Sequence, residues 1–357
     1  MSFESLSHLL GGEDPDLTLV VTGVVLSISV VALCWLFPCL PDSRSSKKDE
    51  PYYGTEAAEV TSLRVYPIKS CAGHEVDCWE LTKTGLKYDR NWVVVGADGR
   101  FRSQRRLPKM AVITPSLPTS DTDPLIIKAP GMPELVVPAR RRGDPGAKEV
   151  PVGVWGDQCT GIDQGEETAT WLSRCLGEPG LRLLRYDDAF TRGTDPAYGR
   201  GFFTAYSDGF PLLLASEESL EDLNARLAQP IGMERFRPNV VVEGMGAWAE
   251  DAWTKVAVGD VVMRVVKPCD RCQVPTIDQS TGTKTGAEPT ATLRAFRTGA
   301  HLGMADEKVA SAVFFGQNVL HEGGRGALRV GDRVEVLRVR VRQPPPPKAA
   351  AAAAKQE

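Results

Sequence analysis

Histidine and cysteine are both scarce in this sequence. Four histidines are spread over 357 residues, and no His-x-x-x-His pair occurs. Eight cysteines are too few, for this length, to form the disulfide framework of a small secreted domain. These two scarcities argue against a histidine-rich metal site and against a disulfide-based scaffold.

A large excess of one charge is also missing. The net charge is −4 and the sequence pI is about 5.8, so bulk binding to nucleic acid has no support. Two motifs of redox proteins are absent as well, namely the Gly-x-Gly-x-x-Gly dinucleotide fingerprint and the Cys-x-x-Cys-His haem motif. If the protein carries out a redox reaction, we expect its electrons to come from an external donor.

One long apolar run is present near the start of the sequence. It extends without a charge from Leu17 to Phe37, and as a helix it would measure about 31 Å, close to the thickness of a hydrocarbon core. A cleaved signal peptide is opposed by the acidic stretch 1–16 and by the length of the run. We therefore predict a transmembrane anchor at 17–37. The basic residues in the linker 38–56 then place the rest of the chain in the cytosol.

Most of the remaining sequence has the pattern of short strands. Strands are predicted in 58–70, 111–117, 124–131 and 134–140, in a hairpin over 91–104, and as a pair in 324–341. Helices are predicted at 166–177, 216–228 and 288–297. The expected fold is α+β and mostly β, a β-barrel with a few attached helices. We expect a boundary between 57–185 and 186–342, and a disordered Pro/Ala tail at 343–357.

The stretch "VVKPCDRCQVPTIDQSTG", residues 265–282, contains a Cys-x-x-Cys. A structural zinc site needs four ligands, and no second close cysteine pair is present. A redox dithiol is expected at the start of a helix, whereas Pro275 and a turn follow here. Two small buried residues without chemistry remain a third interpretation. Arg271 adjoins Cys272 and would favour its thiolate form, which binds metals.

Several cationic or hydrogen-bonding residues lie at predicted strand ends. They occur in "YPIKSCAG", "GLKYDRNW", "AYSDGFP" and "RFRPNVVVEG". Each alone is expected to be a solvated surface group, but together they would suit an anionic ligand with phosphate and a polar ring system. Two further basic stretches, 100–109 and 139–144, are expected to be solvated faces; the alternative is a contact with an acidic cytochrome.

Four separated stretches together resemble the MOSC-domain family. They are "YPIKSCAGHEVD", "YSDGFPLLLASEESLEDLNARL", "FRPNVVVEG" and "KPCDRCQVPTIDQSTG", within a resemblance that covers roughly residues 57–340. Within that family the likeness is to the amidoxime-reducing, membrane-anchored molybdenum enzymes of mitochondria. It implies a MOSC N-terminal β-barrel-like domain at 57–185 and a MOSC domain at 186–342.

The resemblance also implies a cofactor site. Cys272 is the implied molybdenum ligand and catalytic residue. The implied molybdopterin contacts are Lys69, Ser70, Arg90, Ser207, Asp208, Gly209, Arg237, Asn239, Asp270 and Arg271. Where relatives read "SDTSP" this chain reads "SDGFP", so side-chain bonds to the cofactor at Gly209 and Phe210 are in question. Cys269 receives no role.

The implied function is reduction of small N-hydroxylated compounds, such as amidoximes and hydroxylamines, by a molybdenum-cofactor enzyme. Its electrons would come from NADH through NADH-cytochrome b5 reductase and cytochrome b5. The implied location is the outer mitochondrial membrane, with the catalytic body facing the cytosol. Two alternatives stay open: a molybdenum cofactor or sulfur carrier without turnover, and a structural membrane adaptor that has lost its site. The sequence before the apolar run is too short for a cysteine desulfurase, so we expect no sulfur release.

Overall fold

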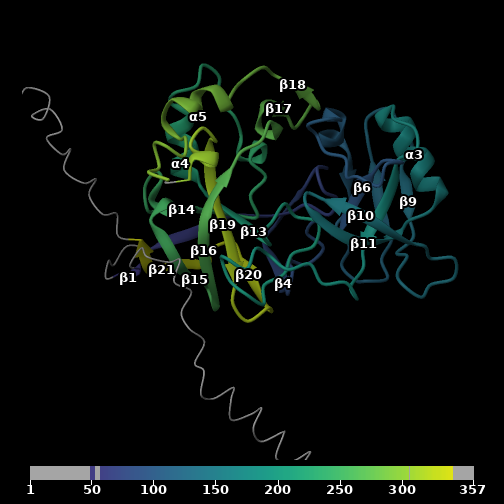
Figure 1. Ribbon diagram of the computed structural model, residues 1–357, viewed down its shortest axis with the longest axis horizontal. Helices are drawn as coiled ribbons and strands as arrows, with labels where there is room; N and C mark the ends of the chain where they lie inside the picture. Colours follow the sequence, from purple (N-terminus) through teal and green to yellow (C-terminus); the bar gives the residue numbers. More distant parts are fainter. Residues whose placement is uncertain (1–48, 53–56, 305, 341–357) are drawn as a thin grey trace, which may run out of the picture. The chain divides into compact units, whose positions relative to one another are not determined.

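The computed structural model describes residues 49–52, 57–304 and 306–340 of the chain (Figure 1). The predicted anchor at 17–37, the tail at 1–16, most of the linker and the tail at 343–357 lie outside these residues. Within the described ranges, no helix is both long and apolar enough to cross a membrane.

Seven strands of one sheet close into a barrel. In order around the sheet they are β21 (Arg333–Arg340), β15 (Trp253–Val258), β16 (Val261–Asp270), β19 (Phe314–His321), β13 (Leu212–Ser216), β14 (Val240–Glu243) and β2 (Ala58–Val65). The first and last of these pair directly, with Ala58 opposite Val334 and Glu59 opposite Arg333. Closure leaves no free edge in this ring of strands. Two short strands, β1 (Asp49–Pro51) and β3 (His74–Val76), pair with β21 and β2.

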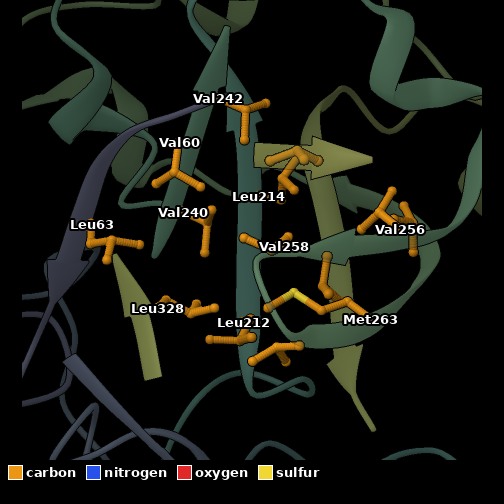
Figure 2. Packing of buried hydrophobic residues seen from close by; sticks show 14 of the residues in the cluster. Val60, Leu63, Leu212, Leu214, Val240, Val242, Val256, Val258, Met263 and Leu328 are labelled. Carbon is orange, nitrogen blue, oxygen red and sulfur yellow. The ribbon is translucent and has the colours of Figure 1, made fainter. Parts of the chain in front are cut away.

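The inside of the barrel is filled with aliphatic side chains (Figure 2). Alternate residues of a strand point to the same face, so Val240 and Val242 share one face of β14, and Val256 and Val258 share one face of β15. All four are at most 1% exposed. A fully packed interior of this kind gives the strand ends a rigid base.

Helix α4 (Glu217–Asn224) connects the barrel's parallel pair, β13 and β14. The hydroxyl of Ser216 caps it by accepting a bond from Ser219 N, as its sequence predicts. Leu220 and Leu223 are buried, but the helix ends before the predicted residue 228. The reason is local, because the Asn224 carboxamide bonds the backbone N–H and C=O of Ile231 and turns the chain away.

Most of the chain between β3 and β13 contributes to smaller sheets, and it includes the helix α3 (Glu166–Leu176), which lies on the right in Figure 1. One sheet has the order β10 (Glu149–Val154), β11 (Asp157–Asp163), β12 (Arg182–Tyr186) and β6 (Trp92–Val95). Another contains β7 (Thr114–Pro115), β8 (Leu125–Lys128) and β9 (Leu135–Val137), and a third contains β20 (Gly326–Arg329), β4 (Cys78–Thr82) and β5 (Gly85–Leu86).

The prediction of a strand over 111–117 is wrong for its first part. Residues Pro108–Val112 form a 3-10 turn that buries Met110 and Ala111, and only Thr114–Pro115 is strand. The backbone N–H of Ile113 bonds Met110 O within this turn, so it is not available to a strand ladder. The fold class is confirmed, since the described body is mostly β, with a closed barrel and the three helices α3, α4 and α5 (Thr290–Phe296). In the predicted hairpin 91–104 only Trp92–Val95 is a strand, and Phe101 pairs with Val95 through an isolated bridge.

Candidate functional site

The Cys-x-x-Cys segment lies where β16 ends. Cys269 is the second-last residue of the strand, and Cys272 follows in a turn that continues into the 3-10 turn η4 (Val274–Thr276). The backbone N–H of Val274 points at Cys272 Sγ, 3.5 Å away. Residues 273–284 form turns and the short hairpin β17 (Ile277–Asp278) and β18 (Thr283–Lys284), so no helix start supports a dithiol. Over the described ranges, no three His, Cys, Asp or Glu side chains are grouped to hold a metal ion.

Arg271 contacts the first cysteine of the segment. Its Nη1 atom lies 3.1 Å from Cys269 Sγ, and its Nη2 atom donates to Phe236 O at 2.8 Å. The sequence predicts that the Arg271 guanidinium lies beside Cys272, whereas in the structure it bonds Cys269. Burial raises the pKa of Cys269 even though Arg271 opposes the shift. The Nε atom of Arg271 is buried and has no partner among the residues described.

Two more arginines, Arg90 and Arg237, stack against the aromatic ring of Tyr66. The guanidinium carbons of Arg90 and Arg237 lie 4.2 and 4.3 Å from the centre of the Tyr66 ring. Arg90 is neutralised by Asp89 at 2.6 Å, and its Nη2 donates to Arg237 O at 3.1 Å. For Arg237 the described part of the chain offers no carboxylate within 4.0 Å, and its Nη2 is buried and unbonded. Burial, with the nearby Arg90 charge, lowers the pKa of Arg237 to about 10.

Lys69 lies on the same side of the molecule. It is 5% exposed and donates to Tyr206 O at 2.8 Å and to the Asp208 carboxylate. Burial lowers its pKa, and Asp208 opposes that shift. Desolvation disfavours the ionised form of Asp208, but the charge of Lys69 outweighs it and holds the pKa of this carboxyl below its usual range. The two side chains therefore form an ion pair.

Backbone bonds connect these groups into one site. Tyr206 N donates to Arg90 O at 3.1 Å, and Tyr206 O accepts from Lys69. Arg90 reaches Arg237, and the preceding Phe236 accepts from Arg271. The residues that the sequence places at separate strand ends therefore converge beside the cysteine segment.

Ser70, Ser207 and Gly209 provide mainly backbone or small polar groups. Ser70 has a φ of 68° and its carbonyl accepts from Gln104 Nε2 at 2.9 Å. The Ser207 hydroxyl oxygen is buried with no partner among the residues described. A methyl group at Gly209 would meet no atom within 4 Å, so open space adjoins the backbone there.

Asn239 and Asp270 are placed differently from the others. Asn239 is 2% exposed, and its side chain bridges backbone groups, donating to Arg64 O at 3.1 Å and accepting from Leu213 N at 3.2 Å. Its carboxamide thus ties β13 to β2. Asp270 is exposed at the end of β16, with Lys267 4.0 Å away.

Arg192 is a supporting residue that the sequence patterns do not reveal. Its guanidinium donates to Ala205 O at 2.9 Å, Ser207 O at 2.6 Å and Asp208 O at 3.0 Å, and it pairs with Asp157 at 2.7 Å. It therefore fixes the backbone that carries Ser207 and Asp208. It lies in the polar, Gly-rich stretch 187–201, which resembles a linker, so no local signal could have found it.

Two aromatic residues were missed as well. The Trp155 indole donates to the Asp208 carboxylate at 2.9 Å, and the Phe101 ring lies 5.2 Å from Lys69 Nζ. A buried amide pair, Gln104 with Gln279 at 2.9 Å, joins the region near Ser70 to the chain after the cysteines. The stretch 100–106, which contains Phe101 and Gln104, is mostly polar and carries no motif, so the sequence gives no signal for their contacts.

A closed β-barrel that gathers cationic side chains around a thiol-bearing strand end defines a MOSC-type protein. The family model described as "MOSC N-terminal beta barrel domain" matches residues 57–179, and the model described as "MOSC domain" matches residues 204–335. The chain belongs to the MOSC-domain family.

Curated relatives match over most of the chain. Mitochondrial amidoxime reducing component 2 of Rattus norvegicus is 35% identical over 294 residues, which cover 78% of this chain and 83% of the relative. Mitochondrial amidoxime-reducing component 1 of Mus musculus is also 35% identical, with 79% and 83% covered. The protein of the same name from Homo sapiens is 33% identical, with 79% and 84% covered.

Proposed function

We propose that this protein binds a molybdenum cofactor and reduces N-hydroxylated compounds such as amidoximes and hydroxylamines. The observation that carries the proposal is a set of buried polar atoms without partners in the described residues: Ser207 Oγ, Arg237 Nη2 and Arg271 Nε. Arg271 belongs to the segment that also carries Cys272, and its guanidinium bonds the carbonyl of Phe236, next to Arg237. The names of the relatives supply the reaction class.

The unpartnered atoms fit an anionic cofactor. A buried donor without an acceptor costs about 1–3 kcal/mol, and a buried cation without a counter-ion costs more. A molybdopterin phosphate and pterin oxygens would accept from these donors, and charge-assisted bonds of this kind are short and strong. The residues present therefore fit the group.

Each side chain would hold the cofactor in a distinct way. Lys69, Arg237 and Arg271 would meet its negative oxygens, and Ser207 would donate its hydroxyl. Ser70 and Gly209 would offer backbone groups, which keeps this part of the cradle intact despite the "SDGFP" sequence. Asp270 would sit at the exposed rim of the site. Arg90 and Asn239 are already bonded within the protein, so their part is to position Arg237 and the strand ends.

When bound, the molybdenum would supply a two-electron redox centre, attached through Cys272. In the overall reaction, the N–OH compound takes up two electrons and two protons, its N–O bond breaks, and the products are the N–H compound and water. Asp208 would stay ionised and hold the Lys69 ammonium in place, since its pKa is depressed. The Val274 N–H at 3.5 Å would stabilise negative charge on Cys272 Sγ.

The proposal includes an external electron supply and a membrane location. Electrons would come from NADH through NADH-cytochrome b5 reductase and cytochrome b5, and residues 17–37 would anchor the protein in the outer mitochondrial membrane. Each of the two basic stretches combines paired arginines with arginines that have no carboxylate partner among the described residues, such as Arg140 in 139–144. In 139–144, Arg141 pairs with Asp121, and Arg142 pairs with Glu149 and Asp187. The stretch 100–109 retains arginines that have no such partners among the described residues.

The direct test is benzamidoxime reduction by cofactor-loaded protein, driven first by a chemical reductant and then by NADH with the two cytochrome b5 proteins. We expect Cys272→Ala to lose activity by at least about 100-fold in both assays, because the metal would lack its protein ligand. Cys269→Ala is the matched control and should retain activity within a few-fold. Full activity of Cys272→Ala would refute the proposal. Retained cofactor without turnover in the wild type would instead favour a carrier.

A further inference from the structure

A pocket of about 870 Å³ adjoins the proposed cofactor site. Its lining combines aromatic rings and arginines, including Phe101, Trp155, Arg100, Arg105 and Arg106. Trp155 bonds Asp208 at 2.9 Å, and Phe101 lies 5.2 Å from Lys69 Nζ. Two residues of the pocket lining therefore contact Lys69 and Asp208 of the proposed cofactor site.

Trp155 occupies a position that the fold does not require to be aromatic. It lies in the two-residue turn between β10 and β11, with a φ of 54°, a region where glycine is usual. Its side chain is 52% exposed. A large exposed ring at a strained turn position costs stability and points to a functional reason. Asp157, two residues further on, forms an ion pair with Arg192. This ion pair holds the Trp155 turn beside the candidate cofactor site.

The arginines of the pocket are of two kinds. Arg106 lies 3.2 Å from Glu178, which also binds Arg102. For Arg100 and Arg105, by contrast, the described residues supply no carboxylate within 4.0 Å. The Arg105 guanidinium carbon instead lies 4.6 Å from the centre of the Trp155 ring. The Trp155 ring also packs against Phe101, with ring centres 5.5 Å apart, and remains half exposed. The pocket thus combines an exposed aromatic surface with positive charge that the described residues leave uncompensated.

We propose that this pocket selects the substrate of the reductase, binding planar aromatic N-hydroxylated compounds that carry a carboxylate or a similar anion. The inference rests on the proposed function and adds a substrate class to it. The exposed part of the Trp155 ring, supported by Phe101, provides the stacking surface for the ligand ring, and Arg105 and Arg100 bind the anion. In this orientation the N–OH group of the ligand faces Asp208 and Lys69, which Trp155 and Phe101 contact.

Three substrates separate the contributions of ring and charge. They are 4-carboxybenzamidoxime, neutral benzamidoxime and acetamidoxime, which has no ring. With a chemical reductant, Arg105→Gln should raise KM for the carboxylate about tenfold relative to benzamidoxime, since a charge-assisted bond of about 1.4 kcal/mol or more is lost. Arg106→Gln, which removes an arginine already paired with Glu178, should change that ratio less than about twofold.

The aromatic contribution is tested at the turn. Trp155→Gly suits the positive φ and should raise KM for both aromatic compounds several-fold relative to acetamidoxime, whereas Trp155→Phe should restore most of the preference. Unchanged preferences in Arg105→Gln and Trp155→Gly would overturn the inference. A loss seen only in the cytochrome-driven assay would overturn it too, and would assign the pocket to partner docking.

Calorimetry keeps this test independent of turnover. The product 4-carboxybenzamidine should bind the wild-type protein about tenfold more tightly than the Arg105→Gln variant. If no amidoxime is reduced by the wild type, the proposed function fails, and this binding difference still decides whether the pocket takes aromatic anions. Equal binding by both proteins would contradict the pocket assignment.

Discussion

Two groups of buried arginines in this molecule differ in what surrounds their charge. Arg297, just after α5, is 4% exposed and donates both Nη atoms to the Asp251 carboxylate, at 2.5 and 2.9 Å. Asp251 also accepts from Gln317 at 2.7 Å. Arg237 is 9% exposed and Arg271 is partly buried, yet the described residues provide neither with a carboxylate partner. The charge of Arg297 is balanced by Asp251, although its Nε atom also has no partner among the described residues. The charges of Arg237 and Arg271 are left for something else to balance.

The difference separates structural from functional use of the same side chain. A buried ion pair is strongly destabilising when it is broken, because the remaining charge then has no compensation. A buried cation with no counter-ion is costly in the folded protein itself, and retaining it makes sense where a ligand supplies the missing charge. Removing Arg297 should therefore mainly lower the stability of the fold, whereas removing Arg237 should mainly weaken cofactor binding.

The largest effect is expected for Arg297→Met. It leaves the largely buried Asp251 carboxylate without its cation, so the free energy of unfolding should fall by about 3–5 kcal/mol. Urea denaturation of the cofactor-free protein measures this loss. The double variant Arg297→Met with Asp251→Leu should recover much of it, because both charges are then gone. Failure of the double variant to recover stability would attribute the loss to packing against Trp248.

A somewhat smaller effect concerns Glu250, beside Asp251. Its carboxylate accepts from the Ser219 hydroxyl, and burial, with the Asp251 charge, raises its pKa to about 7. Because this folded-state pKa lies above the ordinary value of 4.5, the folded protein holds the proton that the unfolded chain releases. Stability should then fall by about 2–3 kcal/mol as pH rises from 4.5 to 7.

Glu250→Gln checks that assignment directly. Glutamine keeps an acceptor for Ser219 but has no charge to bury, so the fall in stability across this pH range should be reduced and the variant should be more stable than wild type at pH 8. Chemical denaturation at a series of pH values measures both. Parallel pH profiles for the two proteins would show that Glu250 does not titrate in this range.

The smallest effect on folding is expected for Arg237→Met. Without cofactor, this variant loses a cation–π contact with Tyr66 but also an uncompensated buried charge, so the net change in stability should stay within about 1 kcal/mol. Its molybdenum content should nevertheless fall well below that of wild type. A loss of folding free energy as large as that of Arg297→Met would remove the distinction between the two groups.

Local patterns predicted much of this architecture. The Ser216 cap and the left-handed Gly177 after α3 are set by neighbouring residues, so the helix starts and ends are largely readable. Closure of the barrel is not readable in this way, because it pairs Ala58 with Val334. A contact between residues so far apart in the chain depends on the whole fold.

The sequence predicted which residues belong to the candidate site better than it predicted the contacts that these residues make. The sequence identified the segment that contains Cys269 and Cys272 and the cationic positions that converge on it. It did not identify Arg192, which binds three carbonyl groups, or Trp155, which lies at a turn where glycine would be expected. It also associated Arg271 with Cys272, whereas the guanidinium reaches back to Cys269. Side-chain direction at a strand end is set by tertiary packing.

The central claim is that one cysteine of the pair holds the metal of a bound cofactor. The most direct measurement is the ratio of molybdenum to protein in wild type, Cys272→Ala and Cys269→Ala, each purified in the same way from a host that makes the cofactor. The account predicts that wild type and Cys269→Ala contain similar molybdenum and that Cys272→Ala contains little. Equal metal content in the two variants, or loss in Cys269→Ala alone, would contradict it.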